Sequence, residues 1–420
     1  MADLRLRRDI AWNLIPVVLL AAVGLGLNFM VAGWWGAGAL GTFNLVTIAY
    51  FVFAVAGACG LQYSVLRAVA ERPDDREHVA AAAVGALVPN VALAAVATAV
   101  FIALRGPIAT LLDSDDVATG MLWVAPGLFC FAINKVLFGI VNGLRRMRAF
   151  AIYTSLRYAL VAVGVLAGHA CSLSAAHLAV IWTFVEGTLL LVLVIELAAT
   201  VSIVRARGWV AWSRTHLAYG TRGLTASIAY EINTKLDVWM LGASGATKAT
   251  VGVYSLAAAI NEGATQLSVV VQNNVNPLLA NELAAGRLDT VHALVRQTRR
   301  WFVPAFVGAC AIGVVLFPSI VTRLVGDPAF AAGARPFAVL MVGLAVASPY
   351  LPFGQLLLMA DRPGWHTALM LIVIASSFVV NLIAIPPLGM LGAACATATA
   401  TIVGALAVRQ LSRYVARVRL

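Results

Sequence analysis

The chain contains one six-residue pattern twice, first as Leu40-Gly41-Thr42-Phe43-Asn44-Leu45 and again as Val251-Gly252-Val253-Tyr254-Ser255-Leu256. In both copies an aliphatic residue precedes a glycine, an aromatic residue follows two positions later, and a long apolar segment begins. Gly41 and Gly252 are 211 residues apart in a chain of 420 residues. A second echo, of Phe138-Gly139 by Phe353-Gly354, falls at nearly the same place in each half. The repeats predict two similar halves.

The composition identifies lipid as the solvent of most of the chain. Hydrophobic residues make up 62% of the sequence and charged residues only 11%, a balance that a water-soluble domain cannot place on its surface. A span needs about 20 apolar residues, and its backbone must satisfy its hydrogen bonds within the segment. The long uninterrupted apolar runs exclude a β-barrel. They predict an all-α integral membrane protein.

The apolar windows predict about twelve transmembrane helices in two six-helix lobes. The windows lie at 13–34, 44–66, 79–104, 119–143, 150–169, 178–203, 221–243, 252–278, 301–322, 336–359, 366–386 and 389–409. The predicted lobes are 1–203 and 221–420, joined by a cytoplasmic interfacial linker at 204–220. Since each half has an even number of spans, the pseudo-twofold axis that relates them is expected along the membrane normal.

The basic residues indicate the orientation. With a cytoplasmic N-terminus, the outer segments contain few lysines and arginines, namely Arg105, Lys248, Arg323 and Arg335. The positive-inside rule therefore predicts that both termini are cytoplasmic. The net charge of +11 is explained by topology and does not indicate a nucleic-acid surface.

Two lobes related by such an axis are typical of a transporter that rocks around a central path. The alternative is a membrane scaffold with duplicated helices. A scaffold would tolerate Lys135→Ala and Lys235→Ala, whereas a transporter with a charged path would not.

Several charged residues lie inside predicted spans, where each costs about 2.5–3.5 kcal/mol on insertion scales and requires a partner or a water-filled cavity. Together with two amides they are the candidate substrate-path residues. The candidates are Asn28, Lys135, Arg157, Glu186, Glu231, Asn233, Lys235, Asp237 and Glu262.

The predicted span 221–243 is the richest in charge. Glu231 and Lys235 are four residues apart and share one helix face, while Asn233 and Asp237 share the opposite face. One stripe would face the lumen and the other would pack against the next span. Alternatively, Glu231 and Lys235 neutralise each other as an internal ion pair.

Lys135 and Arg157 have no acidic partner nearby in the sequence. Ammonium and guanidinium groups bind phosphate oxygens well, so both are candidates to receive a diphosphate headgroup. The alternative is that they snorkel to the cytoplasmic interface. The amides of the stretch Gln272–Pro277 suit sugar hydroxyls, and equally suit the end of a helix before Pro277.

No catalytic constellation is present in the sequence. The histidines show no metal-ligand or triad spacing, and no phosphate-binding Gly-x4-Gly-Lys motif occurs. We therefore expect no enzymatic activity, no cofactor and no metal site. Coupling to H+ or to Na+ stays open.

The stretch from Asn381 to Thr397 reads NLIAIPPLGMLGAACAT. It resembles the signature of polysaccharide flippases in the multidrug/oligosaccharidyl-lipid/polysaccharide (MOP) exporter superfamily. The segments around Asp237 and Tyr254, at Leu40–Phe43 and at Asn142–Arg145 are also similar to this family, and the likeness covers essentially the whole chain.

The resemblance implies a V-shaped, two-lobed transporter with a cationic central cavity. It would flip an undecaprenyl-diphosphate-linked oligosaccharide from the cytoplasmic to the outer leaflet of the bacterial inner membrane by alternating access. The expected partners are this lipid, membrane lipids, a polysaccharide polymerase and glycosyltransferases, but no nucleic acid, and the transporter is expected to be a monomer. The alternative is a cation-coupled multidrug exporter of the same superfamily. The first span lacks the acidic residue that the resemblance leads us to expect of many such exporters, and its only strongly polar residue is Asn28.

Overall fold

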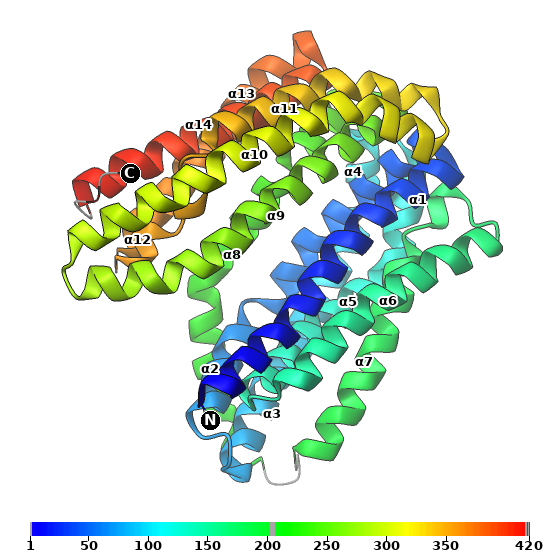
Figure 1. Cartoon of the computed structure of the whole chain (residues 1–420). Coiled ribbons are helices and arrows are strands. Elements are labelled where there is room, and N and C mark those ends of the chain that lie inside the picture. Colours follow the sequence, from blue (N-terminus) through cyan, green and yellow to red (C-terminus); the bar gives the residue numbers. More distant parts are fainter. Residues whose placement is uncertain (1, 202–205, 361, 416–417, 419) are drawn as a thin grey trace. The chain divides into compact units, whose positions relative to one another are not determined.

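The computed structural model describes residues 2–201, 206–360, 362–415, 418 and 420. Within these ranges, the structure describes the backbone but not the side chains of residues 2–22, 25, 222–223, 225–230, 232–234, 273, 277, 280, 284 and 363. The described residues are almost entirely helical and contain no strand, which confirms the predicted all-α fold (Figure 1).

Each predicted span overlaps helical structure, and residues 202–203 of the sixth span lie outside the described residues. The long helices are α1 (Ala2–Ala58), α3 (Arg76–Ala103), α5 (Asp115–Gly143), α6 (Met147–Ala170), α7 (Val180–Thr200), α8 (Trp209–Ala243), α9 (Lys248–Ala284), α10 (Leu288–Val325), α13 (Pro363–Leu388) and α14 (Met390–Val415). The shorter elements are α2 (Leu61–Glu71), α4 (Arg105–Leu111), η1 (Ala175–His177), η3 (Pro328–Gly333), α11 (Ala334–Ala347), η4 (Leu351–Phe353) and α12 (Leu356–Met359).

Three predicted spans differ from a single apolar helix. The first span and most of the second run together in α1, across a kink at Gly36 with φ 85° and ψ 175°, and the end of the second span lies in α2. Glycine adopts this positive φ without a steric penalty, so the kink separates the two spans that the sequence predicts. The predicted span 336–359 is instead broken into α11, η4 and α12.

Nine helices in the described part of the chain are long and apolar enough to cross a membrane. Helix α9, which contains Asn261, Glu262 and Gln266, is not among these nine. Its polar positions set it apart from helices that face only lipid.

Contacts within the chain separate two compact units. Unit 1 comprises Met1–Trp35 and Thr42–Thr234, and unit 2 comprises Gly36–Gly41 and Lys235–Leu420. The main division falls inside α8, between Thr234 and Lys235, and Gly36–Gly41 belong to unit 2. Residues 206–220 of the predicted linker belong to unit 1.

His216 holds the first turns of α8 inside unit 1. Its ring is fully buried, with Nδ1 2.7 Å from Ser64 Oγ and Nε2 3.1 Å from the carbonyl oxygen of Ala82. Burial lowers the pKa of His216, which favours the neutral ring. Since the carbonyl can only accept, Nε2 donates to Ala82 and Nδ1 accepts from Ser64.

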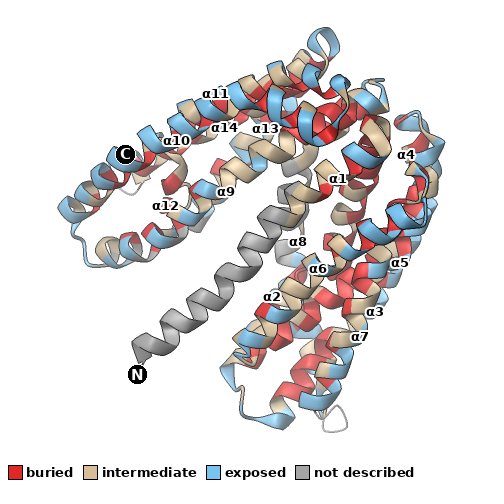
Figure 2. Cartoon of the chain, turned by 45° about the vertical axis from the view of Figure 1, so that its right-hand side comes forward, coloured by how far each residue is buried: buried red, intermediate tan, exposed pale blue. Residues whose placement is uncertain are grey.

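Helix α5 forms the centre of unit 1, where it packs against α2, α3 and α7 and is largely buried (Figure 2). Glycines allow these close approaches. A Cβ atom at Gly127 would lie 2.8 Å from the Thr183 backbone in α7, and one at Gly139 would lie 2.5 Å from the carbonyl oxygen of Gln62 in α2. Small residues are the usual means of bringing membrane helices together.

The glycines of the two copies of the sequence repeat, Gly41 and Gly252, meet inside unit 2. A Cβ atom at Gly41 would collide with the carbonyl oxygen of Lys248, and one at Gly252 would collide with the carbonyl oxygen of Ala37. The contact is reciprocal, because each glycine faces the backbone one turn before the other. The pattern that predicts the duplication is therefore also a helix-crossing site.

Candidate functional site

Arg157 of α6 and Glu186 of α7 form an ion pair within unit 1. Arg157 Nε lies 2.9 Å from Glu186 Oε1, and Arg157 Nη2 donates to Glu186 Oε2 at 3.0 Å. Asn134 of α5 donates to the same Oε2 at 2.8 Å. The Glu186 side chain is 0% exposed and that of Arg157 is 18% exposed. The partner of Arg157 is 29 residues away on the next helix, so the sequence around Arg157 does not reveal it.

Lys135 lies in α5 beside this ion pair. Its Nζ is 5.3 Å from the centroid of the Phe131 ring, and the Arg157 guanidinium lies 5.0 Å from the same centroid. The charges of Glu231, Arg157 and Glu186 all act on Lys135. Unit 1 therefore brings together four of the predicted residues: Lys135, Arg157, Glu186 and Glu231.

An aromatic cluster packs around this charged group. Tyr50 stacks on Trp182 with ring centroids 5.8 Å apart, and it contacts Phe131 edge-on at 5.6 Å. The Tyr50 hydroxyl is buried and has no hydrogen-bond partner among the described residues. These rings surround the charges with low-polarity material, which strengthens electrostatic interactions at the site.

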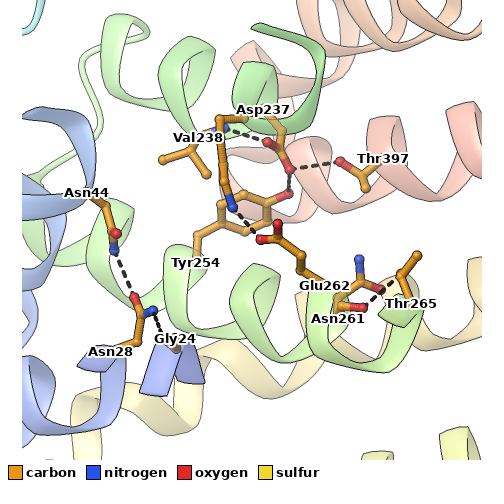
Figure 3. Close-up of polar contacts among 11 residues, drawn as sticks. Gly24, Asn28, Asn44, Asp237, Val238, Tyr254, Asn261, Glu262, Thr265 and Thr397 are labelled. Atoms are coloured by element: carbon orange, nitrogen blue, oxygen red, sulfur yellow. Dashed lines mark hydrogen bonds and ion pairs between the residues drawn. The ribbon is translucent and has the colours of Figure 1, made fainter. Parts of the chain in front are cut away.

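Asn28 interacts with the first copy of the sequence repeat. Asn44 Nδ2 donates to Asn28 Oδ1 at 3.2 Å, while Asn28 Nδ2 donates to the carbonyl oxygen of Gly24 at 2.9 Å (Figure 3). Both side chains are half-buried. Asn44 belongs to the first copy of the repeat, but its contact with Asn28 was not predicted from the sequence.

Asp237 of α8 is the buried carboxylate of unit 2, with 7% exposure. Its Oδ2 accepts hydrogen bonds from the Tyr254 hydroxyl of α9 and, at 2.8 Å, from Thr397 Oγ1 of α14 (Figure 3). Its Oδ1 accepts from the backbone N–H of Val238 at 2.9 Å. Every donor that the structure gives this carboxylate is neutral.

The Asp237 cluster connects three motifs that lie far apart in the sequence. Asp237 precedes the second repeat, Tyr254 is the aromatic residue of that repeat, and Thr397 ends the stretch 381–397. Local sequence patterns do not identify Tyr254 and Thr397 as site residues, although Tyr254 lies in the second repeat and Thr397 in the stretch 381–397. Only the fold shows that these motifs converge on one carboxylate.

Lys235 of α8 forms its ion pair with Glu262 of α9. The two side chains are 34% and 51% exposed, so this pair is much more accessible than Arg157–Glu186. The pairing joins two helices, whereas the sequence spacing had pointed to Glu231. The side chain of Asn233 lies outside the described residues.

The described residues contain no group of three or more His, Cys, Asp or Glu side chains that could hold a metal ion. The chemistry offered by the two clusters is charge recognition and hydrogen bonding. Lys135 and Arg157 can bind oxyanions, and Asp237 can bind a cation or a proton.

Comparisons with known proteins identify solved structures with a similar fold. No protein-family model and no curated protein sequence matches the chain. Among solved structures, an inward-facing multidrug resistance MATE family transporter of the MOP superfamily aligns over 97% of this chain and 98% of its own, with a TM-score of 0.80 and 14% identity. The lipid II flippase MurJ in an inward closed conformation aligns over 96% of this chain and 87% of its own, with a TM-score of 0.79 and 13% identity.

A further similar structure is a MOP superfamily transporter from Pyrococcus furiosus, with a TM-score of 0.61 and 15% identity over 98% of this chain and 95% of its own. A lipid flippase and multidrug transporters thus share this helical arrangement. The chain is a multi-pass membrane protein with the fold of the MOP superfamily transporters.

Proposed function

We propose that the protein flips a polyprenyl-diphosphate-linked oligosaccharide from the cytoplasmic to the outer leaflet of a bacterial inner membrane, for surface polysaccharide synthesis. The transport would proceed by alternating access, with both termini cytoplasmic. In this proposal Lys135 contacts the diphosphate. The Arg157–Glu186 pair and the nearby aromatic rings fix the position of the Lys135 side chain.

The observation that carries the proposal is the placement of Lys135. Glu186 Oε2 accepts hydrogen bonds from Arg157 and Asn134, and Glu186 Oε1 lies 2.9 Å from Arg157 Nε. Lys135 lies within the influence of Glu231, Arg157 and Glu186, and in this proposal it receives the incoming anion. An ammonium group held beside buried aromatic rings binds phosphate more strongly than one in water.

The fold supports the same class of substrate. One of the structures that it resembles is a lipid II flippase, and the sequence around 381–397 resembles polysaccharide flippases. Asn28 and Asn44 supply amides of the kind that recognise sugar hydroxyls. Lys235 and Glu262 are exposed enough to exchange partners during transport.

Lys135→Met tests the proposed contact. We expect a deletion strain to accumulate lipid-linked repeat units at the cytoplasmic leaflet and to lose surface polysaccharide. Wild-type protein and Lys135→Arg should restore the polysaccharide, because both keep the cation, whereas Lys135→Met should restore less than about one-tenth of it, since a charge-assisted hydrogen bond is worth about 1.5–3 kcal/mol. Normal polysaccharide in the deletion strain, in the absence of a paralogue, would contradict the proposal.

A second candidate function is a cation-coupled multidrug exporter, and Asp237 is the observation that favours it. A buried carboxylate with only neutral donors can release or take up a cation without breaking an ion pair. Export of amphipathic drugs would then be driven through this group, with H+ or Na+ as the coupling ion.

Asp237→Asn separates this candidate from the flippase. The amide keeps the shape of the side chain but removes the charge, so in an exporter we expect drug resistance to fall to the level of the deletion strain. Asp289→Asn, at an exposed position of α10, is the matched control and should change nothing. The exporter is rejected when drug accumulation is the same in wild-type, deletion and Asp237→Asn cells.

A further inference from the structure

The tenth predicted span is broken in a way that its counterpart in unit 1 is not. Helix α5 continues from Asp115 to Gly143, whereas the corresponding span of unit 2 stops at Ala347 and resumes as η4 and α12. Pro349 and Pro352 fall in the break and cannot donate backbone hydrogen bonds. Irregular backbone within a membrane span is tolerated where protein buries it or where it lines a polar cavity.

Arg299 of α10 lies against this break. Its Nε donates to the carbonyl oxygen of Pro349 at 2.8 Å, and its guanidinium lies 4.6 Å from the centroid of the Tyr350 ring. Its Nη2 is buried and has no hydrogen-bond partner among the described residues. A buried charged donor without an acceptor is rare in proteins, and a bound anion is one of its ordinary explanations.

Amides from α9 border the other end of the break. Asn276 Nδ2 donates to Gln355 Oε1 at 2.9 Å, and its Oδ1 is buried with no partner among the described residues. A Cβ atom at Gly354 would lie 3.0 Å from Gln272 Nε2. Gln272 and Asn276 belong to the amide-rich stretch that the sequence singled out.

The second sequence echo makes the break around Tyr350 in unit 2 equivalent to the surroundings of Lys135 in unit 1. Lys135 precedes Phe138-Gly139 by three positions, and Tyr350 precedes Phe353-Gly354 by three positions. In unit 1 the cation at this position is Lys135 itself, whereas in unit 2 it is the Arg299 guanidinium placed over Tyr350. Each unit therefore has a cation near the equivalent point of its repeat, and unit 1 has the Arg157 guanidinium there as well, 5.2 Å from the centroid of the Phe138 ring.

The glycines of this echo have similar surroundings. Gly139 packs against the backbone of Gln62 in α2, and Gly354 packs against the side chain of Gln272 in α9. Gln62 Oε1 is also buried without a partner among the described residues. Both places thus combine a cation, a glutamine and an unsatisfied polar atom.

We propose that the break in unit 2 is a second binding site for a phosphate group carried by a lipid. Arg299 Nη2 donates to a phosphate oxygen, Tyr350 orients the guanidinium, and the amides of Gln272 and Asn276 bind the adjoining polar group. The inference rests on the proposed function, because it assigns unit 2 a contact with the substrate class that Lys135 would bind in unit 1.

Binding to the purified full-length protein tests the second site. The probes are undecaprenyl diphosphate, phosphatidylglycerol, inorganic pyrophosphate and undecaprenol, titrated in detergent and followed by native mass spectrometry. We expect Arg299→Met to weaken undecaprenyl diphosphate binding about ten-fold or more, since it removes a charged hydrogen bond. Arg299→Lys should weaken binding less, because it keeps the charge but loses the fork geometry.

Arg300→Met is the matched control, since Arg300 is the exposed neighbour on the same helix. It should leave the Kd unchanged. Undecaprenol should not bind at this site. If Arg299→Met weakened phosphatidylglycerol binding more than undecaprenyl diphosphate binding, the site would be assigned to membrane lipid. If inorganic pyrophosphate bound with the same Kd as undecaprenyl diphosphate, the proposal that the phosphate is carried by a lipid would be overturned.

The outcomes for the two sites are separable. A lower melting temperature of ligand-free Arg299→Met with an unchanged Kd would show that Arg299 only supports the break, and would overturn the second site. Weakening by Lys135→Met but not by Arg299→Met would overturn the second site and leave the proposed function intact. Weakening by Arg299→Met alone would support the second site and contradict the role given to Lys135.

Discussion

Glu186→Ala is expected to destabilise unit 1 by about 3–5 kcal/mol, the usual penalty for removing one partner of a buried ion pair. The substitution leaves the Arg157 guanidinium, which is 18% exposed, without its carboxylate, and it removes one of the two acceptors of Asn134, which keeps the carbonyl oxygen of residue 186. The protein should lose most of its monodisperse fraction in detergent, as measured by size-exclusion chromatography after heating.

Two further variants test whether an unpaired buried charge causes the loss of stability in Glu186→Ala. The double variant Glu186→Leu with Arg157→Met removes both charges and should recover most of the stability, because no buried charge is left unpaired. Lys235→Met breaks the exposed pair with Glu262 and should cost no more than about 1 kcal/mol. Equal melting temperatures for Glu186→Ala and Lys235→Met would contradict this account of unit 1.

Gly252→Val is expected to disrupt the packing of α9 against the segment Gly36–Gly41 within unit 2. The new Cβ atom would collide with the carbonyl oxygen of Ala37, and a backbone atom cannot rotate out of the way as a side chain can. Overpacking of this kind costs about 1–3 kcal/mol or more. We expect a large drop in the yield of folded protein and in its melting temperature.

Gly263→Ala provides the control in the same helix, since a Cβ atom at Gly263 meets no atom within 4 Å. This variant should be neutral or slightly stabilising, because alanine favours helix more than glycine does. Gly41→Val should reproduce the defect of Gly252→Val, since the contact is reciprocal. A stable Gly252→Val protein would show that the crossing is looser than the structure indicates.

The helical architecture was predictable because hydropathy is a local property. Each predicted span overlaps helical structure among the described residues, and the kink at Gly36 falls between the first two spans. The break at Pro349 and Pro352 was missed, although two prolines inside an apolar window were a visible signal. Hydropathy windows count apolar residues and do not register the loss of backbone donors.

The partners of the buried charges could not be read from the sequence. Glu186 is 29 residues from Arg157, and Glu262 is 27 residues from Lys235, so each pair depends on how helices pack. Helical spacing identifies neighbours on one helix only, which is why it pointed from Lys235 to Glu231. The hydroxyls that bind Asp237 come from two other helices and were equally beyond the reach of local spacing.

The most direct test of the central claim is translocation of a labelled lipid by the purified protein in liposomes. The probe is undecaprenyl-diphosphate-linked N-acetylglucosamine with a fluorophore that externally added dithionite reduces only in the outer leaflet. Wild-type protein should make the inner-leaflet pool accessible, while Lys135→Met protein and empty liposomes should leave it protected. A fluorescent phosphatidylcholine should stay protected throughout. Failure of wild-type protein to move the diphosphate lipid, or equal movement with Lys135→Met, would contradict the account.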